Sequence, residues 1–373
     1  MPKRYGSVYD NLKFLTMSFD AMQWARPNIR SLVPYSSARD EFHGEAKVFI
    51  DANENSLGSP LLKWYNRYPD PHQQKLKEKI STIKGIGPEH IFLGNGSDEA
   101  IDILFRTFCE PAQDEVIICP PTYGMYEVSA NINHIRVVRV PLTTDFQLDL
   151  GQLEAAVTAR TKIIWLCSPN NPTGNSLRRE DVEMLLNNFS GLVVIDEAYI
   201  NFSRQKSFIQ ELPDYPNLVV LQTLSKAWGL AALRLGMAFA STAIIGLMDK
   251  VKPPYNINEP AQELALKALE ELGQVNDMIR IIVQEKARLA EALPQLPMVE
   301  KVHPSDANFL LVRMRHSREI YEFLLARGIV VRDRTHTKGC ENSLRITIGT
   351  PQENQQLWQA LCDFAETMEA EKA

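Results

Sequence analysis

A lysine that follows an apolar run is the residue in this sequence best suited to covalent chemistry. The run ends at Leu221, and Thr223, Ser225, Lys226 and Arg234 follow within thirteen positions. An amine can attack a carbonyl carbon, and hydroxyl groups with a guanidinium can bind phosphate, so this stretch suits a Schiff base formed beside a phosphate group. A lone lysine is more often a solvated surface residue, but the apolar residues on both sides, Trp228 among them, make a surface position less expected.

Three further polar groups follow apolar runs or begin a helical pattern. Ser97 and Asp98 follow a glycine-rich turn at the start of a helix, where backbone N–H groups and the helix dipole suit a phosphate. Asn171 lies in the loop 167–174, whose prolines and glycine can aim its amide at a ligand oxygen. Asp196 ends an apolar run, and a carboxylate there can keep a cationic ring nitrogen protonated.

Each of these features also has a purely structural interpretation. The glycine-rich turn can be an ordinary turn with Ser97 as its N-cap, and Asn-Pro and Thr-Gly are common turn dipeptides. An acid at the end of a strand can cap the next element or bind a metal. Because the carboxyl ends of parallel strands meet at one edge of a sheet, four such features in series favour one shared ligand site.

Short β-branched runs alternate with helical patterns from about residue 90, which predicts an α/β domain with a mostly parallel sheet covered by helices. The stripe Ile101, Leu104, Phe105 and Phe108 has the spacing of a helix face that packs on this sheet. The predicted strands are 115–119, 134–140, 162–167, 191–196 and 218–221.

The pattern changes after Pro253-Pro254, because adjacent prolines break a helix. Residues 259–293 then read as one long amphipathic helix or a kinked pair, and strand-like and helical runs alternate to the C-terminus, which predicts a smaller α/β or α+β domain. We expect an N-terminal segment 1–47 that packs on the small domain or a partner subunit, a large domain 48–255 and a small domain 256–373. The later runs are strands 308–313, 329–332 and 344–348 and helices 317–327 and 352–368.

Composition excludes several classes of protein. Of 373 residues, 45% are hydrophobic and 23% are charged, as in ordinary globular proteins, and the net charge of −6 argues against a nucleic-acid partner. Five scattered cysteines read as reduced thiols of a cytoplasmic protein, and the seven histidines lack metal-site spacing, so we expect no metal. No apolar block is long enough to predict a signal sequence or membrane span.

Six motifs in one order resemble the fold-type I, class II aminotransferases of the aspartate aminotransferase superfamily, which depend on pyridoxal 5'-phosphate. They are the glycine-rich turn, the aromatic loop around Tyr123, Asn-Pro-Thr-Gly, Asp-Glu-Ala-Tyr, Ser-Lys and Arg-Leu-Gly. Narrower features are similar to the histidinol-phosphate aminotransferases and extend the resemblance from about residue 27 to the C-terminus. These features are the segments 32–39, 51–55, 67–70, 119–126 and 344–349, together with Arg332.

The resemblance implies a role for each cofactor-binding residue. Lys226 would hold the cofactor as a Schiff base and then move the proton between the substrate α-carbon and the cofactor. Asp196 would pair with the ring nitrogen, Asn171 and Tyr199 would hydrogen-bond the 3-oxygen, and Tyr123 would stack on the ring. A phosphate contact from the other subunit implies a homodimer with shared active sites. The implied phosphate-binding residues are Ser97, Asp98, Thr223, Ser225, Arg234 and, from the partner chain, Tyr68.

The resemblance also implies substrate-binding residues, namely Tyr35, Asn53, Asn171, Arg332 and Arg345. Without it, the two arginines would be interpreted as members of surface ion pairs. The implied reaction is reversible amino transfer between L-histidinol phosphate and 2-oxoglutarate, giving imidazole-acetol phosphate and L-glutamate in histidine biosynthesis. The alternatives are an aromatic or broad-range aminotransferase or a threonine-phosphate decarboxylase on the same fold, and, from another class, a catalytically silent cofactor-binding regulator.

Overall fold

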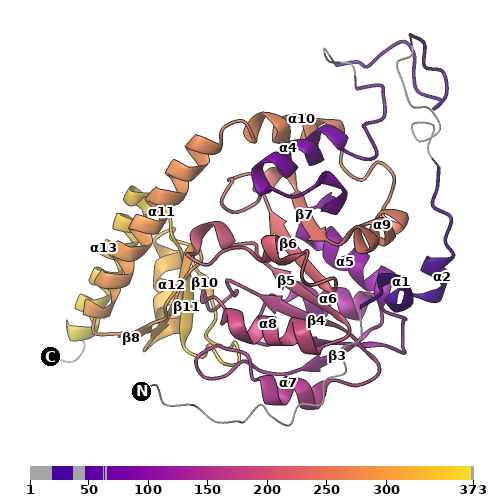
Figure 1. The fold of residues 1–373 in the computed structure, drawn as a ribbon. Helices are drawn as coiled ribbons and strands as arrows, with labels where there is room; N and C mark the ends of the chain where they lie inside the picture. The colour runs from indigo at the N-terminus through magenta and orange to yellow at the C-terminus, as the bar shows by residue number, and fades with distance from the viewer. Residues whose placement is uncertain (1–18, 37–46, 62, 64, 371–373) are drawn as a thin grey trace, which may run out of the picture.

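A seven-stranded sheet forms the centre of the larger domain in a computed structural model, which describes residues 19–36, 47–61, 63 and 65–370 (Figure 1). The strand order is β1-β7-β6-β5-β4-β2-β3. β7 runs antiparallel to both of its neighbours and the other strands share one direction, so the predicted mostly parallel sheet is confirmed. The strands are β1 (Ile91–Asn95), β2 (Glu115–Ile118), β3 (Arg136–Arg139), β4 (Thr161–Cys167), β5 (Leu192–Asp196), β6 (Leu218–Thr223) and β7 (Leu235–Ala240).

Both faces of this sheet are buried, which explains why its strands read as continuous apolar runs. Along β5, Val193 and Ile195 belong to the core on one face, while Leu192 and Val194 belong to the core on the other. The first face packs against α4 (Gln74–Lys84), α7 (Leu150–Ala156), α8 (Arg179–Asn188) and α10 (Glu259–Ala268). The second face packs against α1 (Ala21–Trp24), α2 (Pro27–Arg30), α5 (Ser97–Phe108), α6 (Met125–Ile132) and α9 (Thr242–Val251).

The five strands predicted for this domain agree with β2 to β6 to within two residues at each end. The sequence reasoning missed β1 and β7. β7 has the sequence Leu-Gly-Met-Ala-Phe-Ala, which lacks the β-branched residues that mark a strand. Its strand conformation comes from the pairing with β1 and β6 on its two sides.

The smaller domain is an antiparallel sheet in the order β10-β11-β9-β8, covered by long helices, as the predicted α+β alternative requires. The predicted strand 329–332 begins later, at Arg332. Gly328 has φ +74° and the Ile329 N–H still donates to Leu324 O (2.9 Å), so these two residues complete the end of helix α12 (Ser317–Ala326). β8 was not predicted. The elements are β8 (Val299–Val302), β9 (Phe309–Met314), β10 (Arg332–Asp333), β11 (Ser343–Thr347), α11 (Leu272–Ala292), α12 (Ser317–Ala326) and α13 (Pro351–Ala370).

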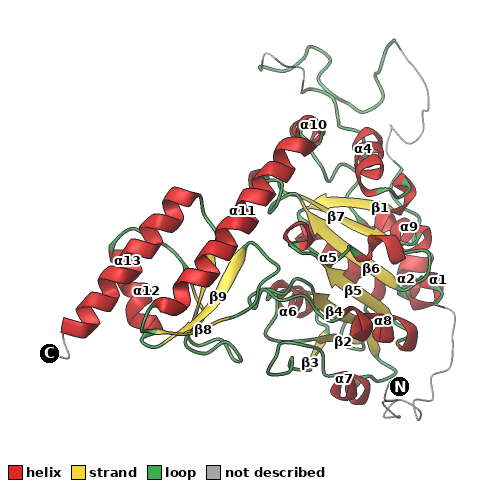
Figure 2. Ribbon diagram, turned by 60° about the vertical axis from the view of Figure 1, so that its left-hand side comes forward, coloured by secondary structure: helices red, strands yellow, loops and turns green. Residues whose placement is uncertain are grey.

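The region 259–293 is a pair of helices, α10 and α11, and α11 extends from the large domain to the small one (Figure 2). Ala261, Ala265 and Val275 pack in the core of the large domain, whereas Leu289 packs in the core of the small domain. We therefore propose that the domain boundary lies within α11 rather than at the expected position after residue 255.

The described part of the N-terminal segment packs on the large domain. Ala21, Ala25 and Ile29 are buried in the core beside α5 and α9, so residues 19–36 pack on the large domain of their own chain. Packing of this segment on a partner subunit stays a prediction. No helix in the described residues is long and apolar enough to cross a membrane. Short 3-10 segments complete the described elements, at Pro88–His90, Ile200–Phe202, Phe208–Glu211, Ala231–Leu233 and Leu293–Gln295.

Candidate active site

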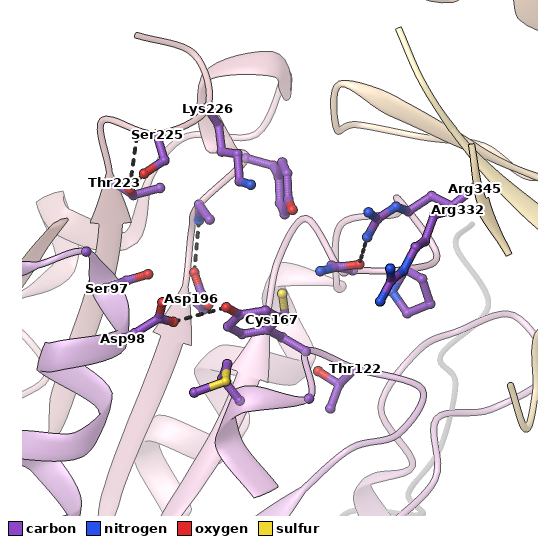
Figure 3. A pocket seen from close by; sticks show the side chains of 18 of the residues that line it. Ser97, Asp98, Thr122, Cys167, Asp196, Thr223, Ser225, Lys226, Arg332 and Arg345 are labelled. Atoms are coloured by element: carbon purple, nitrogen blue, oxygen red, sulfur yellow. Dashed lines mark hydrogen bonds between the residues drawn. The ribbon is translucent and has the colours of Figure 1, made fainter. Parts of the chain in front are cut away.

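The loops that follow β4, β5 and β6 enclose a cavity of about 650 Å³ together with residues of the small domain. Because these strands are parallel, the polar residues at their ends meet at one edge of the sheet, as the sequence predicted. Figure 3 shows Ser97, Asp98, Thr223 and Ser225 on one side of the cavity and the small-domain arginines on the other. Twelve of the fifteen predicted site residues line it: Ser97, Asp98, Tyr123, Asn171, Asp196, Tyr199, Thr223, Ser225, Lys226, Arg234, Arg332 and Arg345.

One end of the cavity is a cup of hydrogen-bond donors. The Thr223 hydroxyl donates to Ser225 Oγ (3.0 Å) and accepts from the Ser225 N–H (3.0 Å), which fixes both side chains. The Arg234 guanidinium lies 3.4 Å from the Asp98 carboxylate and 3.5 Å from Ser225 Oγ. With the N-terminus of the twelve-residue helix α5, whose first residue is Ser97, this cup has the donors and positive field that an anion such as phosphate requires.

Two glycines allow the backbone segments around this cup to approach closely. A Cβ atom on Gly236 would lie 2.1 Å from Ser97 N, so only glycine lets β7 pass the start of α5. Gly96 has φ +74°, and its N–H donates to the Arg234 carbonyl (2.7 Å). Arg234 itself has φ +54°, which is uncommon for a residue with a side chain.

Asp196 lies at the end of β5 with its carboxylate buried. It accepts hydrogen bonds from the Tyr126 hydroxyl (Oη–Oδ2 2.8 Å) and from the Ala198 N–H (3.0 Å). Burial raises its pKa to about 6, although these two bonds act in the opposite direction. A cationic partner in the cavity would therefore favour the ionised form of this carboxylate.

Tyr123 forms an aromatic wall of the cavity beside Asp196. Tyr123 donates its hydroxyl hydrogen bond to Asp98 (3.0 Å), and its ring meets the Tyr126 ring edge to face at 5.6 Å. Burial, with the nearby charge of Asp98, raises the pKa of Tyr123, so its hydroxyl stays protonated. The Tyr123 ring is thereby held as one wall of the cavity.

Lys226 lines the cavity, and its amine lies 5.7 Å from the centre of the Tyr199 ring. Removal of water by the surrounding protein lowers its pKa, and the positive charge of Arg345 acts in the same direction. A lower pKa increases the fraction of neutral amine, which is the nucleophilic form. Tyr199 is buried and meets Phe309 edge to face at 5.2 Å.

The far side of the cavity carries positive charge from the small domain. Arg332 of β10 and Arg345 of β11 are directly opposite each other in the antiparallel ladder. The Arg345 guanidinium donates to Asn171 Oδ1 (2.5 Å), which links the small domain to the loop after β4 (Figure 3). A pair of guanidinium groups suits a carboxylate or a phosphate.

Three predicted site residues do not reach this cavity within the chain. Tyr35, Asn53 and Tyr68 are exposed, and Tyr68 stacks on Tyr255 with ring centres 4.5 Å apart. The segment 47–61 extends away from the body of the domain in Figure 1. Their predicted roles therefore depend on a second subunit or on a movement of this segment.

The structure adds two residues that sequence reasoning did not assign. Tyr126 follows Tyr123 by three positions, and the first turn of α6 places its hydroxyl on Asp196, beneath the cavity. Arg334 follows Arg332 by two positions and lines the cavity with it. The sequence could have indicated Arg334, because side chains two positions apart on an extended chain point to the same side.

Comparison with known proteins identifies this arrangement. Residues 51–361 match the family described as aminotransferase class I and II. The chain belongs to this family. Aminotransferases of this family use pyridoxal 5'-phosphate, and the solved structure of a histidinol-phosphate aminotransferase from Sinorhizobium meliloti in complex with that cofactor has the same fold, with a TM-score of 0.74 at 24% identity over 82% of this chain and 84% of that one.

Two further proteins are similar to this chain, one in sequence and one in fold. Over 345 residues, 92% of this chain and 99% of the relative, the chain is 50% identical to a histidinol-phosphate aminotransferase from Cytophaga hutchinsonii. An L-threonine-O-3-phosphate decarboxylase from Porphyromonas gingivalis has a TM-score of 0.70 at 26% identity, with 81% of this chain and 91% of that chain covered.

The cavity has the donors that pyridoxal 5'-phosphate requires. A cup for its phosphate lies at one end, where Gly96 and Gly236 leave no room for side chains. The buried carboxylate of Asp196 and the amine of Lys226 lie in the same cavity (Figure 3). An anion, a cationic ring nitrogen and an aldehyde can therefore all find complementary groups in this aminotransferase.

The raised pKa of Asp196 predicts a pH dependence of the apoprotein's stability. The ordinary value is 3.8 and the folded value is about 6, so the stabilising contribution is complete below pH 3.8 and is lost as the pH rises through 6. The shift corresponds to roughly 3 kcal/mol at about 1.4 kcal/mol per pKa unit. Between about pH 4 and pH 7, the free energy of unfolding of the wild-type apoprotein should fall by most of this amount relative to Asp196→Asn.

Urea denaturation of the two apoproteins at equal protomer concentration measures this difference. The asparagine variant keeps the shape of the side chain and removes only the titration, so other carboxyl groups contribute equally to both proteins. A difference in unfolding free energy that does not change with pH would contradict the raised pKa.

Proposed function

We propose that this chain transfers the amino group of L-histidinol phosphate to 2-oxoglutarate, giving imidazole-acetol phosphate and L-glutamate, in histidine biosynthesis. The observation that carries the proposal is the 50% identity to the Cytophaga histidinol-phosphate aminotransferase over 99% of that protein's length. The cluster of arginines across the cavity from the cup supports it, because this donor carries a phosphate group.

The bound cofactor supplies an electron sink for the carbanion that forms when the substrate α-carbon loses its proton. In our proposal, the amine of Lys226 holds the cofactor and then moves this proton. Asp196 keeps the ring nitrogen protonated, and Tyr126 keeps the Asp196 carboxylate in place through its 2.8 Å hydrogen bond. Asn171 and Tyr199 bind the ring oxygen, and Tyr123 stacks on the ring. The cup for the cofactor phosphate consists of Ser97, Asp98, Thr223, Ser225 and Arg234.

The substrate lies between the cofactor and the small domain in this proposal. Arg345, which already contacts Asn171, binds the anionic group of every substrate, and Arg332 adds a second guanidinium for the phosphate. Tyr35 and Asn53 contribute to substrate binding once the segments that carry them are placed over the cavity.

Replacement of the two arginines by alanine should affect different substrates differently. Each charge-assisted contact contributes about 1.5–3 kcal/mol, so its loss lowers kcat/KM by roughly 10- to 150-fold. We expect Arg332→Ala to reduce kcat/KM for histidinol phosphate more than for glutamate or phenylalanine, and Arg345→Ala to reduce it for all three. Stopped-flow measurement of each half-reaction gives these values, and an unchanged ratio of donors in Arg332→Ala would contradict the assignment.

We further propose a homodimer in which each site takes Tyr68 from the partner subunit. The exposure of Tyr68 outside the cavity of its own chain supports this arrangement.

All five cysteines lie in the described residues and form no disulfide, which supports the expected cytoplasmic location.

Mixing two defective subunits tests the shared site. In a heterodimer of Lys226→Ala and Tyr68→Ala chains, one site has both residues intact and the other lacks both. Random exchange makes half of the dimers heterodimers, so about a quarter of all sites should regain wild-type activity. Activity that stays at the sum of the two parent homodimers, after subunit exchange is verified by mass spectrometry, would contradict sharing.

A decarboxylase of threonine phosphate is the second candidate, because a solved structure with that name has the same fold at 26% identity. Incubation with histidinol phosphate and 2-oxoglutarate should yield glutamate, and incubation with O-phosphothreonine should release no carbon dioxide. Carbon dioxide release without glutamate formation would favour the decarboxylase and overturn the proposal.

A further inference from the structure

Arg334 places a third guanidinium at the small-domain side of the cavity. Its backbone N–H donates to the Ser343 carbonyl (2.9 Å), so the chain continues beside β11 past the end of β10. Arg332 and Arg334 are two positions apart and both line the cavity. Asp333 between them is engaged elsewhere, because it accepts a hydrogen bond from the Arg318 guanidinium (3.1 Å).

Among the described residues, no hydrogen bond or ion pair engages the Arg334 side chain, and its buried Nε has no acceptor. The buried Nε of Arg345 also has no acceptor. Burial lowers the pKa of Arg334, and the positive charges of Arg345 and Arg332 lower it further. The cluster therefore lacks the negative charge that would stabilise it.

The acids that line the cavity do not supply this charge. Asp98 is engaged by Tyr123 and Arg234, and Asp196 by Tyr126. Figure 3 shows both acids across the cavity from Arg332 and Arg345. Like charges opposite each other in a ladder are destabilising, so a bound anion would stabilise this cluster.

The number of guanidinium groups distinguishes between possible anions. A carboxylate has one negative charge and two oxygens, which two guanidinium groups can saturate. A phosphate ester near neutral pH carries up to two charges and three terminal oxygens, so it can accept from a third guanidinium. We infer that Arg334 binds the terminal phosphate of the amino donor and sets the preference of this site for a phosphate dianion over a carboxylate. This inference rests on the proposed function.

Three variants of the holoenzyme test the role of Arg334. Arg334→Gln removes the charge, Arg334→Lys keeps the charge but not the forked geometry, and Arg313→Gln removes a charge from an exposed arginine of β9 that pairs with Glu300 (3.3 Å) outside the cavity. We expect Arg334→Gln to lower kcat/KM for histidinol phosphate by roughly 10- to 150-fold and for glutamate by much less. Arg334→Lys should be intermediate, and Arg313→Gln should match the wild type.

Inhibition of the glutamate half-reaction by inorganic phosphate provides a second measurement that does not require histidinol phosphate. Its inhibition constant should rise at least about 10-fold in Arg334→Gln, while the visible spectrum of the bound cofactor stays unchanged. An equal loss for both donors, or an unchanged phosphate inhibition constant, would overturn the role of Arg334. If the wild type does not use histidinol phosphate, the proposed function fails, whereas a donor ratio that is unaltered in Arg334→Gln counts against Arg334 alone.

Discussion

Lys226→Ala should lower the rate of transamination on the order of 10⁴-fold, the upper range for loss of a catalytic acid or base. Lys226 has the sole primary amine among the described residues that line the cavity, and its lowered pKa favours the nucleophilic form. The variant loses both the group that holds the cofactor and the group that moves the proton. Steady-state kinetics and the visible absorbance of the reconstituted protein measure the two losses separately.

Lys301→Ala is the matched control for this variant. Lys301 is an exposed residue of β8 outside the cavity, so its replacement should leave both the rate and the visible spectrum unchanged. A Lys226→Ala protein that transaminates at the wild-type rate would exclude Lys226 as the catalytic amine.

Asp196→Asn should lower kcat by roughly 10²- to 10³-fold, the usual effect of removing a fixed electrostatic partner from a reacting centre. The substitution keeps the shape of the side chain, so the Tyr126 hydroxyl can still find an oxygen at the end of β5. Without the negative charge, however, the ring nitrogen of the cofactor is less readily protonated and stabilises the carbanion poorly. Cofactor binding should persist, because the cup at the start of α5 is unchanged.

Single-turnover rates with saturating glutamate, measured alongside the cofactor content of the purified protein, separate the chemical effect from weaker cofactor binding. The sequence supplies a control in Asp98, whose Asn variant should weaken the hold on Tyr123 and Arg234 and thus affect cofactor affinity more than kcat. A near-normal single-turnover rate in Asp196→Asn would remove Asp196 from the reaction.

The central strands were predictable because burial on both faces leaves a simple signal. β4 is apolar from Ile163 onward and β5 is apolar up to Asp196, which ends it, while Asn171 follows β4. The sequence therefore indicated both the strands and the position of the site. β7 could not be predicted in this way. It contains Gly236 because a side chain there would collide with the backbone of Ser97, and this contact joins segments about 140 positions apart.

The arrangement of the arginines could not be predicted from the sequence either. The opposition of Arg332 and Arg345 depends on the register of β10 against β11, and strand β10 was expected three residues earlier. Tyr126 was visible only as part of a motif, since its bond to Asp196 joins residues 70 positions apart. The roles of Tyr35, Asn53 and Tyr68 stay predictions, because none of these residues lines the cavity of the chain to which it belongs.

The most direct test of the proposed function is the relative reactivity of amino donors with the wild-type holoenzyme. Half-reactions with histidinol phosphate, glutamate and phenylalanine, followed by stopped-flow absorbance of the cofactor, give kcat/KM for each donor. We predict that histidinol phosphate exceeds phenylalanine by at least roughly 10-fold, equivalent to about 1.4 kcal/mol of additional transition-state stabilisation by the arginine cluster. A wild-type enzyme that reacts faster with phenylalanine would contradict the proposal and indicate a general aromatic aminotransferase.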